Sequence, residues 1–465
     1  MNQSGKMSVT EGHRKRVTER VVRVFLLMIL FVAGGVSLSA TPRLYKKASK
    51  RTQTEISYQL RYRMSGTVGF LNRDDKVRDF KFDRPVITGG TVAIEFLPTG
   101  RWKCLQQWNN ASVGLAFSVF DMGQQQYLGQ AFAPYTYLNV PLLNRPRVTF
   151  GLRPGLGLAF VNRTYANTVP SDQKWQALKQ NNKPIANQSI GSIANVFMSG
   201  GIYLDVALAE CWDFTFSGGW QHLSNGSVMT PNGGYNMFNA EVGVAYTPAY
   251  KTNGFHYFKP DSDVPSKLHD GVTKKWGIDI TMGGGVRSVY YKDRDWFAAA
   301  SLSVSAYWQP YSVFRIGIGA DMYYDGAYAA IYKSFAGEGT AHVTEYKKTY
   351  LSESKTLNCF RAGVSIQPEF VLGNLTFGYH VGIYLFDPVK NLEPFSAVTA
   401  NGGKPLNRGI FYSYDPTKAS NVQDGWCYQR LILRYYCGQH FFVYTGLKLH
   451  IFKAEFIDAG IGFRI

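Results

Sequence analysis

The fold class is decided by the stretch WDFTFSGGWQHLSNGSVMTPNGGYN, residues 212–236. In its first half, apolar or aromatic side chains alternate with polar ones, residue by residue. A period of two is the pattern of a β-strand, whose successive side chains point to opposite faces. His222 and Ser224 fall on the same face as Trp220 and the other aromatic residues. We therefore predict a strand that carries a histidine and a serine, roughly 7 Å apart, on an apolar surface.

The same alternation recurs along most of the chain. Aromatic residues make up 15% of the sequence, glycines number 47 and charged residues only 18%, a mixture that favours strands and tight turns over helices. Further strand candidates are residues 56–64, 92–96, 113–119, 147–161, 194–208, 235–246, 276–282, 301–308, 314–321, 360–370, 375–385, 427–436, 440–450 and 454–465.

Several of these candidates are longer than the roughly 5–6 residues typical of soluble sheets, and their polar faces carry charged side chains. A transmembrane barrel needs about 10 alternating residues per pass, and its closure leaves no open strand edge in the bilayer. We predict an all-β fold, a single transmembrane antiparallel β-barrel of about 14 to 16 strands over residues 41–465. The apolar row that ends at Ile465 resembles the C-terminal sorting strand of outer-membrane proteins, although those usually end in an aromatic residue.

Residues 1–40 have the pattern of a signal peptide. Basic residues precede an apolar run from Val24 to Val36, and small residues follow at Ser39 and Ala40. An uncleaved anchor is the alternative, but this run is short for a membrane span. The whole chain carries +18, and residues 1–40 hold six Lys/Arg and two Asp/Glu, which leaves 18 − 4 = +14 after cleavage. For an exported protein we expect the anionic partner to be a phosphorylated lipid surface and not nucleic acid.

Loop lengths predict the orientation of the barrel. Short turns are expected at 144–146, 209–210, 373–374 and 438–439, and long segments at 163–189, 325–356 and 387–425. Bacterial barrels keep short turns on the periplasmic side and long loops outside. Because the strand from Trp212 begins at a short turn, its far end, with His222 and Ser224, should face outside. The long stretch 249–273 falls on the periplasmic side and breaks the pattern, which leaves a periplasmic excursion or a miscounted strand.

The polar pair on this apolar row could carry chemistry. A nucleophilic serine needs a base, and the base needs an acceptor to orient it. Asn236 has the parity of the outward row on the next strand, so His222, Ser224 and Asn236 could form such a cluster, with Asn225 and the N–H of Gly226 as oxyanion donors. Glu241 has the opposite parity and should point into the lumen. The plain alternative is a polar pair that meets lipid headgroups at the membrane interface.

The run His222-Leu223-Ser224-Asn225-Gly226, followed by Pro231-Asn232-Gly233-Gly234, resembles the signature of PagL-type lipid A deacylases, the acyloxyacyl hydrolase family. This resemblance implies an outer-membrane enzyme of a Gram-negative bacterium that removes an ester-linked acyl chain from the glucosamine 3-position of lipid A. It implies Ser224 as nucleophile, His222 as general base and Asn225 as oxyanion donor, with no metal and no cofactor.

Two features depart from the family. Asn236 stands where the family has an acidic residue, so the triad is completed either by Asn236 or by another group such as Glu241. The resemblance covers about residues 55–250, and the family barrel has eight strands, so residues 251–465 would add further strands and long surface loops.

Other functions stay open at this point. A barrel of this size also suits a porin-like or fatty-acid-type transport channel, and the long loops suit a structural surface protein. The five cysteines lack metal-ligand spacing. Cys427 and Cys437 could pair in an oxidising compartment, but free thiols are the simpler expectation. A homodimer, the acyl position and the chain length are not decided by the sequence.

Overall fold

The computed structural model describes residues 58–72, 86–98, 103–145, 147–168, 187, 189–209, 211–229, 231–248, 275–288, 296–327, 356–387, 427–450 and 453–465. These ranges consist mainly of β-strands, which confirms the predicted all-β class. The expected signal peptide, residues 1–40, lies outside the described residues. The stretch 249–273 lies wholly outside them, 325–356 and 387–425 lie almost wholly outside, and 163–189 lies outside except for residues 163–168, 187 and 189.

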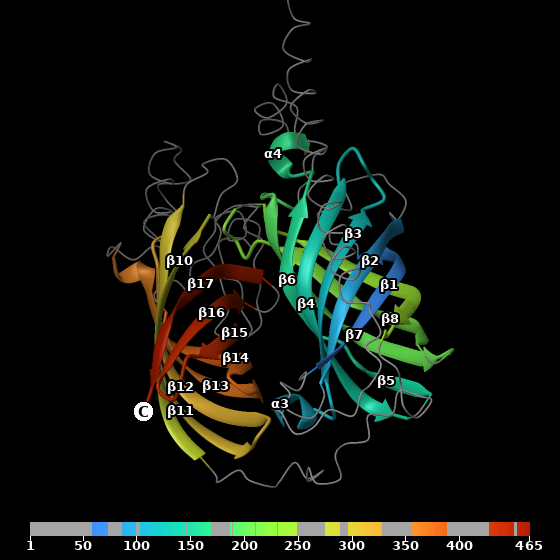
Figure 1. Ribbon diagram of the computed structural model, residues 1–465. Coiled ribbons are helices and arrows are strands. Elements are labelled where there is room, and N and C mark those ends of the chain that lie inside the picture. The colour runs from blue at the N-terminus through green and yellow to red at the C-terminus, as the bar shows by residue number, and fades with distance from the viewer. Residues whose placement is uncertain are drawn as a thin grey trace, which may run out of the picture. The chain divides into compact units, whose positions relative to one another are not determined.

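The first sheet is built from the N-terminal half of the chain, coloured blue to green in Figure 1. Its strands are β1 (Tyr58–Leu71), β2 (Val86–Pro98), β3 (Ser112–Asp121), β4 (Gln130–Asn144), β5 (Val148–Leu152), β6 (Gly155–Val161), β7 (Ala194–Ala207), β8 (Trp212–Ser224) and β9 (Tyr235–Tyr246). Two short helices, α3 (Lys103–Gln106) and α4 (Tyr165–Thr168), lie in its connections.

Antiparallel pairing closes this sheet into a ring, because β9 returns to β1 and β3 also pairs with β4. The strand predicted over 147–161 is interrupted at Arg153 and Pro154, a residue that has no N–H to give to a ladder. Its two pieces, β5 and β6, both pair with β4 and β7 and share one position. The nine strands therefore fill 9 − 1 = 8 positions.

The second sheet, coloured yellow to red in Figure 1, is a closed barrel of its own in which β10 pairs with β17. Its strands are β10 (Lys275–Arg287), β11 (Phe297–Tyr311), β12 (Phe314–Asp325), β13 (Phe360–Leu372), β14 (Leu375–Phe386), β15 (Cys427–Tyr436), β16 (Phe441–His450) and β17 (Lys453–Arg464). A short 3₁₀ helix, η1 (Leu357–Cys359), precedes β13.

The predicted single barrel of about 14 to 16 strands is therefore wrong. Alternation reveals which face each side chain takes, but it does not reveal which strands pair. After β9 the chain has closed one ring, and β10 opens the next. This topology also accounts for the anomalous stretch 249–273, which joins the two barrels. An even number of passes returns the chain to the side of the membrane on which it started.

The burial pattern is the reverse of that in a soluble protein. In β10, for example, Trp276 is 76% exposed on the outside, whereas Asp279 on the inside is 1% exposed. Exposed apolar side chains form rows on the outside of both barrels. Contact with lipid requires such an apolar outer surface in a transmembrane barrel. In the described part of the chain, no helix is long and apolar enough to cross a membrane.

Paired charges occupy the inside of the second barrel. Arg315 meets Glu369 at 2.5 Å and Arg430 meets Asp458 at 2.5 Å, all four side chains being buried. Buried charges of this kind are tolerated because each has a partner. These pairs join β12 to β13 and β15 to β17 inside the barrel.

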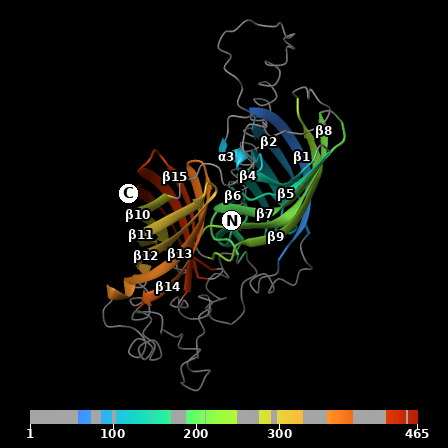
Figure 2. The same ribbon diagram turned by 90° about the horizontal axis from the view of Figure 1, so that it is seen from below.

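The first barrel has a different interior at the end where β8 finishes. There the inward-facing residues form an apolar core that includes Phe120, Phe197, Leu223, Tyr235 and Met237. Strand pairing places β8 between β7 and β9, which are the green strands of the first barrel in Figure 2. The outward residues at this end of the three strands therefore lie over a packed apolar core.

Candidate active site

The predicted pair on β8 lies on the outer row of the first barrel. His222 and Ser224 alternate with the buried inward residue Leu223, and their outward neighbours across the ladder on β7 are Met198 and Val196. The imidazole of His222 stacks on Trp220, with ring centroids 5.5 Å apart and planes inclined by 15°. One member of the aromatic row, Trp220, therefore packs against the histidine ring.

The structure brings His222, Ser224 and Asn236 into one chain of hydrogen bonds. Strand pairing sets Asn236 on β9 directly opposite His222. The Nδ1 atom of His222 lies 2.8 Å from Asn236 Oδ1, and its Nε2 atom lies 2.8 Å from Ser224 Oγ. The parity argument from the sequence correctly predicted this convergence.

The partner atoms fix the direction of these bonds. The amide oxygen of Asn236 can only accept, so His222 carries its proton on Nδ1 and leaves Nε2 unprotonated. The hydroxyl of Ser224 then donates to Nε2, which is the arrangement in which a base can take the proton of a nucleophile. Ser224 is only 4% exposed although it lies on the outer row.

The connection after Ser224 is shaped by residues with positive φ. Gly226 has φ +61° and Gly234 has φ +71°, a region that glycine enters without steric cost. Gly234 lies against the histidine ring: a Cβ built there would be 2.7 Å from His222 Cε1 and 3.1 Å from Ser224 Cβ. Only a residue without a side chain fits behind the imidazole at this place.

Asn225, expected as an oxyanion donor, anchors the connection in this arrangement. Its amide Nδ2 donates to Ser192 Oγ at 2.7 Å and to the carbonyl of Met229 at 2.8 Å. Its backbone N–H donates to Asn232 Oδ1 at 3.0 Å. Both amide hydrogens are therefore engaged, and an oxyanion could take one of them only in exchange for an existing bond.

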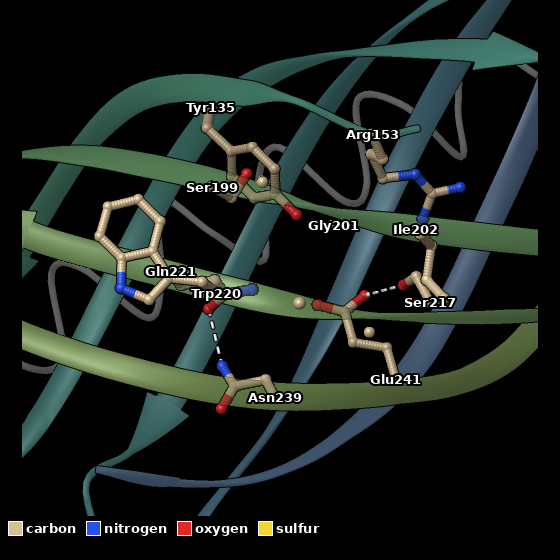
Figure 3. A pocket seen from close by; sticks show the side chains of 13 residues that line it. Tyr135, Arg153, Ser199, Gly201, Ile202, Ser217, Trp220, Gln221, Asn239 and Glu241 are labelled. Carbon is tan, nitrogen blue, oxygen red and sulfur yellow. Dashed lines mark hydrogen bonds between the residues drawn. The ribbon is translucent and has the colours of Figure 1, made fainter. Parts of the chain in front are cut away.

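Glu241, the alternative acidic member, faces the inside of the first barrel. It accepts hydrogen bonds from Ser65 at 3.3 Å and Ser217 at 3.4 Å. Figure 3 shows its carboxylate pointing toward Ser217 in a cavity of the barrel, beside the Asn239–Gln221 pair. Because Glu241 lies on the face opposite His222, it does not complete the triad in this structure.

Two neighbours of the site had no predicted role, although one of them, Asn232, belongs to the signature run Pro231-Asn232-Gly233-Gly234. Ser192 comes from the connection between β6 and β7, and Asn232 from the β8–β9 connection. Neither has a local pattern that signals its role, because each acts on a residue brought near by folding. Among the described residues, no group of three or more His, Cys, Asp or Glu side chains could hold a metal ion. All five cysteines are free thiols.

Two of the solved structures that match the chain do so at low sequence identity. Neisserial surface protein A (NspA) aligns over 40% of this chain and 96% of its own, at 8% identity and a TM-score of 0.24. A Rhodopseudomonas blastica porin triple mutant aligns over 87% of this chain and 100% of its own, at 9% identity and a TM-score of 0.16. At these TM-scores the two alignments establish neither a shared fold nor a shared function. No curated protein matches the chain.

Family comparison covers both barrels. Residues 92–245, within the first barrel, match the family described as lipid A 3-O-deacylase (PagL). Residues 276–399 and 409–465, within the second, match the family described as acyloxyacyl hydrolase, C-terminal domain. These matches agree with the outward cluster on β8 and β9 and with the apolar outer walls. The chain belongs to the PagL-type lipid A deacylases, outer-membrane β-barrel hydrolases that remove an ester-linked acyl chain from lipid A.

Proposed function

We propose that Ser224 is the nucleophile of this deacylase, that His222 is its general base, and that Asn236 orients the imidazole. The observation that carries the proposal is the continuous chain of hydrogen bonds from Ser224 through His222 to Asn236 on the outer wall. This wall is where lipid meets a transmembrane barrel, so an acyl ester could reach Ser224 from the membrane.

In the first half of the reaction, Ser224 Oγ attacks the ester carbonyl carbon while its proton passes to His222 Nε2. The tetrahedral intermediate collapses as the bond to the sugar oxygen breaks, and that oxygen takes the proton from His222. An acyl group is then held on Ser224 as an ester. Asn236 accepts from Nδ1–H throughout and keeps Nε2 directed at the reacting oxygen atoms.

In the second half, a water molecule gives a proton to His222 and attacks the acyl carbonyl, which releases the fatty acid and restores Ser224. We assign the oxyanion contacts to the backbone N–H of Gly226 and to Asn225, whose amide would exchange one of its two present bonds. The mechanism uses no metal ion and no cofactor. By the family description, the ester removed is the one at the 3-position of lipid A.

We place the cluster toward the outer leaflet. It lies at the end of β8 remote from the short 207–212 turn, and the long connection between β6 and β7 emerges at the same end. Bacterial barrels hold their long connections outside the cell. The sequence left open whether the protein is a homodimer. The molecular mass of the purified full chain in detergent would decide between one copy and two.

The purified full chain tests the assignment with three treatments of one preparation. We expect fatty-acid release from lipid A to continue in excess chelator, to stop in Ser224→Ala, and to stop after treatment with a serine-directed phosphonate. Peptide mass spectrometry should then find the phosphonate on Ser224. Loss of activity in chelator would contradict the metal-free mechanism, and a label elsewhere would contradict the nucleophile.

A further inference from the structure

A buried asparagine, Asn187, lies in the connection between β6 and β7. Its residue is 0% exposed. Its Nδ2 atom donates to the carbonyl of Arg163 at 2.9 Å and to the hydroxyl of Tyr235 at 2.6 Å. Its Oδ1 atom accepts from the N–H groups of Ser189, at 3.1 Å, and Ile190, at 3.2 Å. Both amide hydrogens and both lone pairs are therefore in use.

These bonds join the β6–β7 connection to the first residue of β9. Tyr235 begins β9, and the next residue, Asn236, holds His222. In the same connection, the carbonyl of Ser189 accepts from the N–H of Gly234 at 2.9 Å. Asn187 thus holds Tyr235, and Ser189 holds Gly234. These are the two residues that immediately precede Asn236.

Each of these two residues has little freedom to move. The Tyr235 ring belongs to the apolar core of the first barrel, and its hydroxyl is buried there. Besides the bond from Asn187, that hydroxyl donates to the carbonyl of Leu128 at 3.4 Å. The backbone of Gly234 lies directly against the His222 ring. A shift at either residue would therefore move the acceptor of His222 or the surface behind its ring.

We propose that Asn187 is a positioning residue for deacylation. It touches none of the reacting atoms and acts through Tyr235 and Gly234, holding Asn236 opposite His222 and the backbone of Gly234 against the imidazole. The inference rests on the proposed function and deepens it. It assigns to the β6–β7 connection a part in setting the rate of the reaction and not only the stability of the barrel.

The test compares Asn187→Ala and Tyr235→Phe with wild type, as purified full chains acting on lipid A in mixed micelles. We expect kcat to fall by about 10- to 100-fold in Asn187→Ala, since a displacement near 1 Å can cost that much, while KM changes by less than about twofold. Tyr235→Phe removes a single hydroxyl and should lower kcat in the same direction. This milder variant carries the test if Asn187→Ala does not fold.

Asn139→Ala is the matched control. Asn139 is 3% exposed in the same barrel and is also well bonded, to Glu95, Ser112 and Arg153, but it lies on β4 away from the cluster. A purely structural role predicts that activity falls in each variant only in proportion to its folded fraction, as seen by heat-modifiability. A positioning role predicts that the folded fraction of Asn139→Ala keeps the kcat of wild type, whereas the folded fraction of Asn187→Ala has a lower kcat.

A double variant separates the two roles further. If Asn187 acts through the Asn236–His222 bond, adding Asn187→Ala to Asn236→Ala should lower kcat by no more than about threefold, because coupled changes are not additive. Fully additive losses, or wild-type kcat in both Asn187→Ala and Tyr235→Phe, would overturn the inference. Activity that survives Ser224→Ala would instead overturn the proposed function, so the two failures are distinguishable.

Discussion

Asn236 allows the sharpest test of how this site works, because Asp has the same shape and adds a charge. Asn236→Asp would place a carboxylate oxygen where the amide oxygen now lies, 2.8 Å from His222 Nδ1. When Ser224 loses its proton, the imidazole becomes positive, and a carboxylate stabilises that charge whereas an amide does not. Charge-assisted hydrogen bonds contribute about 1.5–3 kcal/mol against about 0.5–1.5 for neutral ones. A difference of about 1–1.5 kcal/mol corresponds to about a 5- to 13-fold rise in kcat.

Asn236→Ala should have the opposite effect. It leaves the Nδ1–H of a half-buried ring without its acceptor, at a cost of about 1–3 kcal/mol, or about a 5- to 150-fold fall in kcat. Asn236→Glu, one methylene longer, should retain or raise activity if the side chain can fold back. Glu241→Gln is the control, because Glu241 faces the interior and its loss should hardly change kcat.

The assay is the initial rate of fatty-acid release from lipid A, with the folded fraction of each variant measured by heat-modifiability. An inactive Asn236→Asp together with a fully active Asn236→Ala would refute the role of Asn236. An inactive Glu241→Gln would show that the register of β9 differs from that described here.

Three other predictions concern the rest of the chain. Gly234→Ala should nearly abolish activity, measured by the same assay, because a Cβ would press on His222 Cε1 at 2.7 Å and an L-residue is strained at φ +71°. Glu369→Leu should lower the free energy of unfolding of the second barrel, measured in urea, by about 3–5 kcal/mol, since it leaves Arg434 without its hydrogen-bonded carboxylate and Arg315 with Asp279 alone; an unchanged free energy would contradict the ion-pair account. Protease added to intact cells should cut within 163–189, 325–356 and 387–425, and cuts that need a breached outer membrane would invert the orientation.

Much of the site was predictable because a strand converts sequence spacing directly into a face. The parity of His222, Ser224 and Asn236 placed all three on the outer wall, and the same rule sent Glu241 inside. The resemblance added the roles of these residues. The resemblance gave no role to Asn187 or Ser192. Their contacts depend on how the β6–β7 connection packs against the β8–β9 connection and the start of β9.

The arrangement of strands was harder to predict than the strands themselves. Strand β4 was not predicted, because Pro134 and Pro141 interrupt the pattern that a strand normally shows. The division into two barrels was not predicted either, since alternation is the same on both sides of a barrel boundary. The pairing of β9 with β1 depends on tertiary contacts between residues far apart in the chain.

Mass spectrometry of lipid A from cells tests the central claim most directly. Cells that express the wild-type chain should contain lipid A lighter by one ester-linked acyl chain, and cells that express Ser224→Ala should contain the unshortened form. Both proteins should be present in the outer membrane in equal amounts and should be equally heat-modifiable. Identical lipid A in the two strains, whether shortened in both or in neither, would contradict the claim that Ser224 on the outer wall of the first barrel deacylates lipid A.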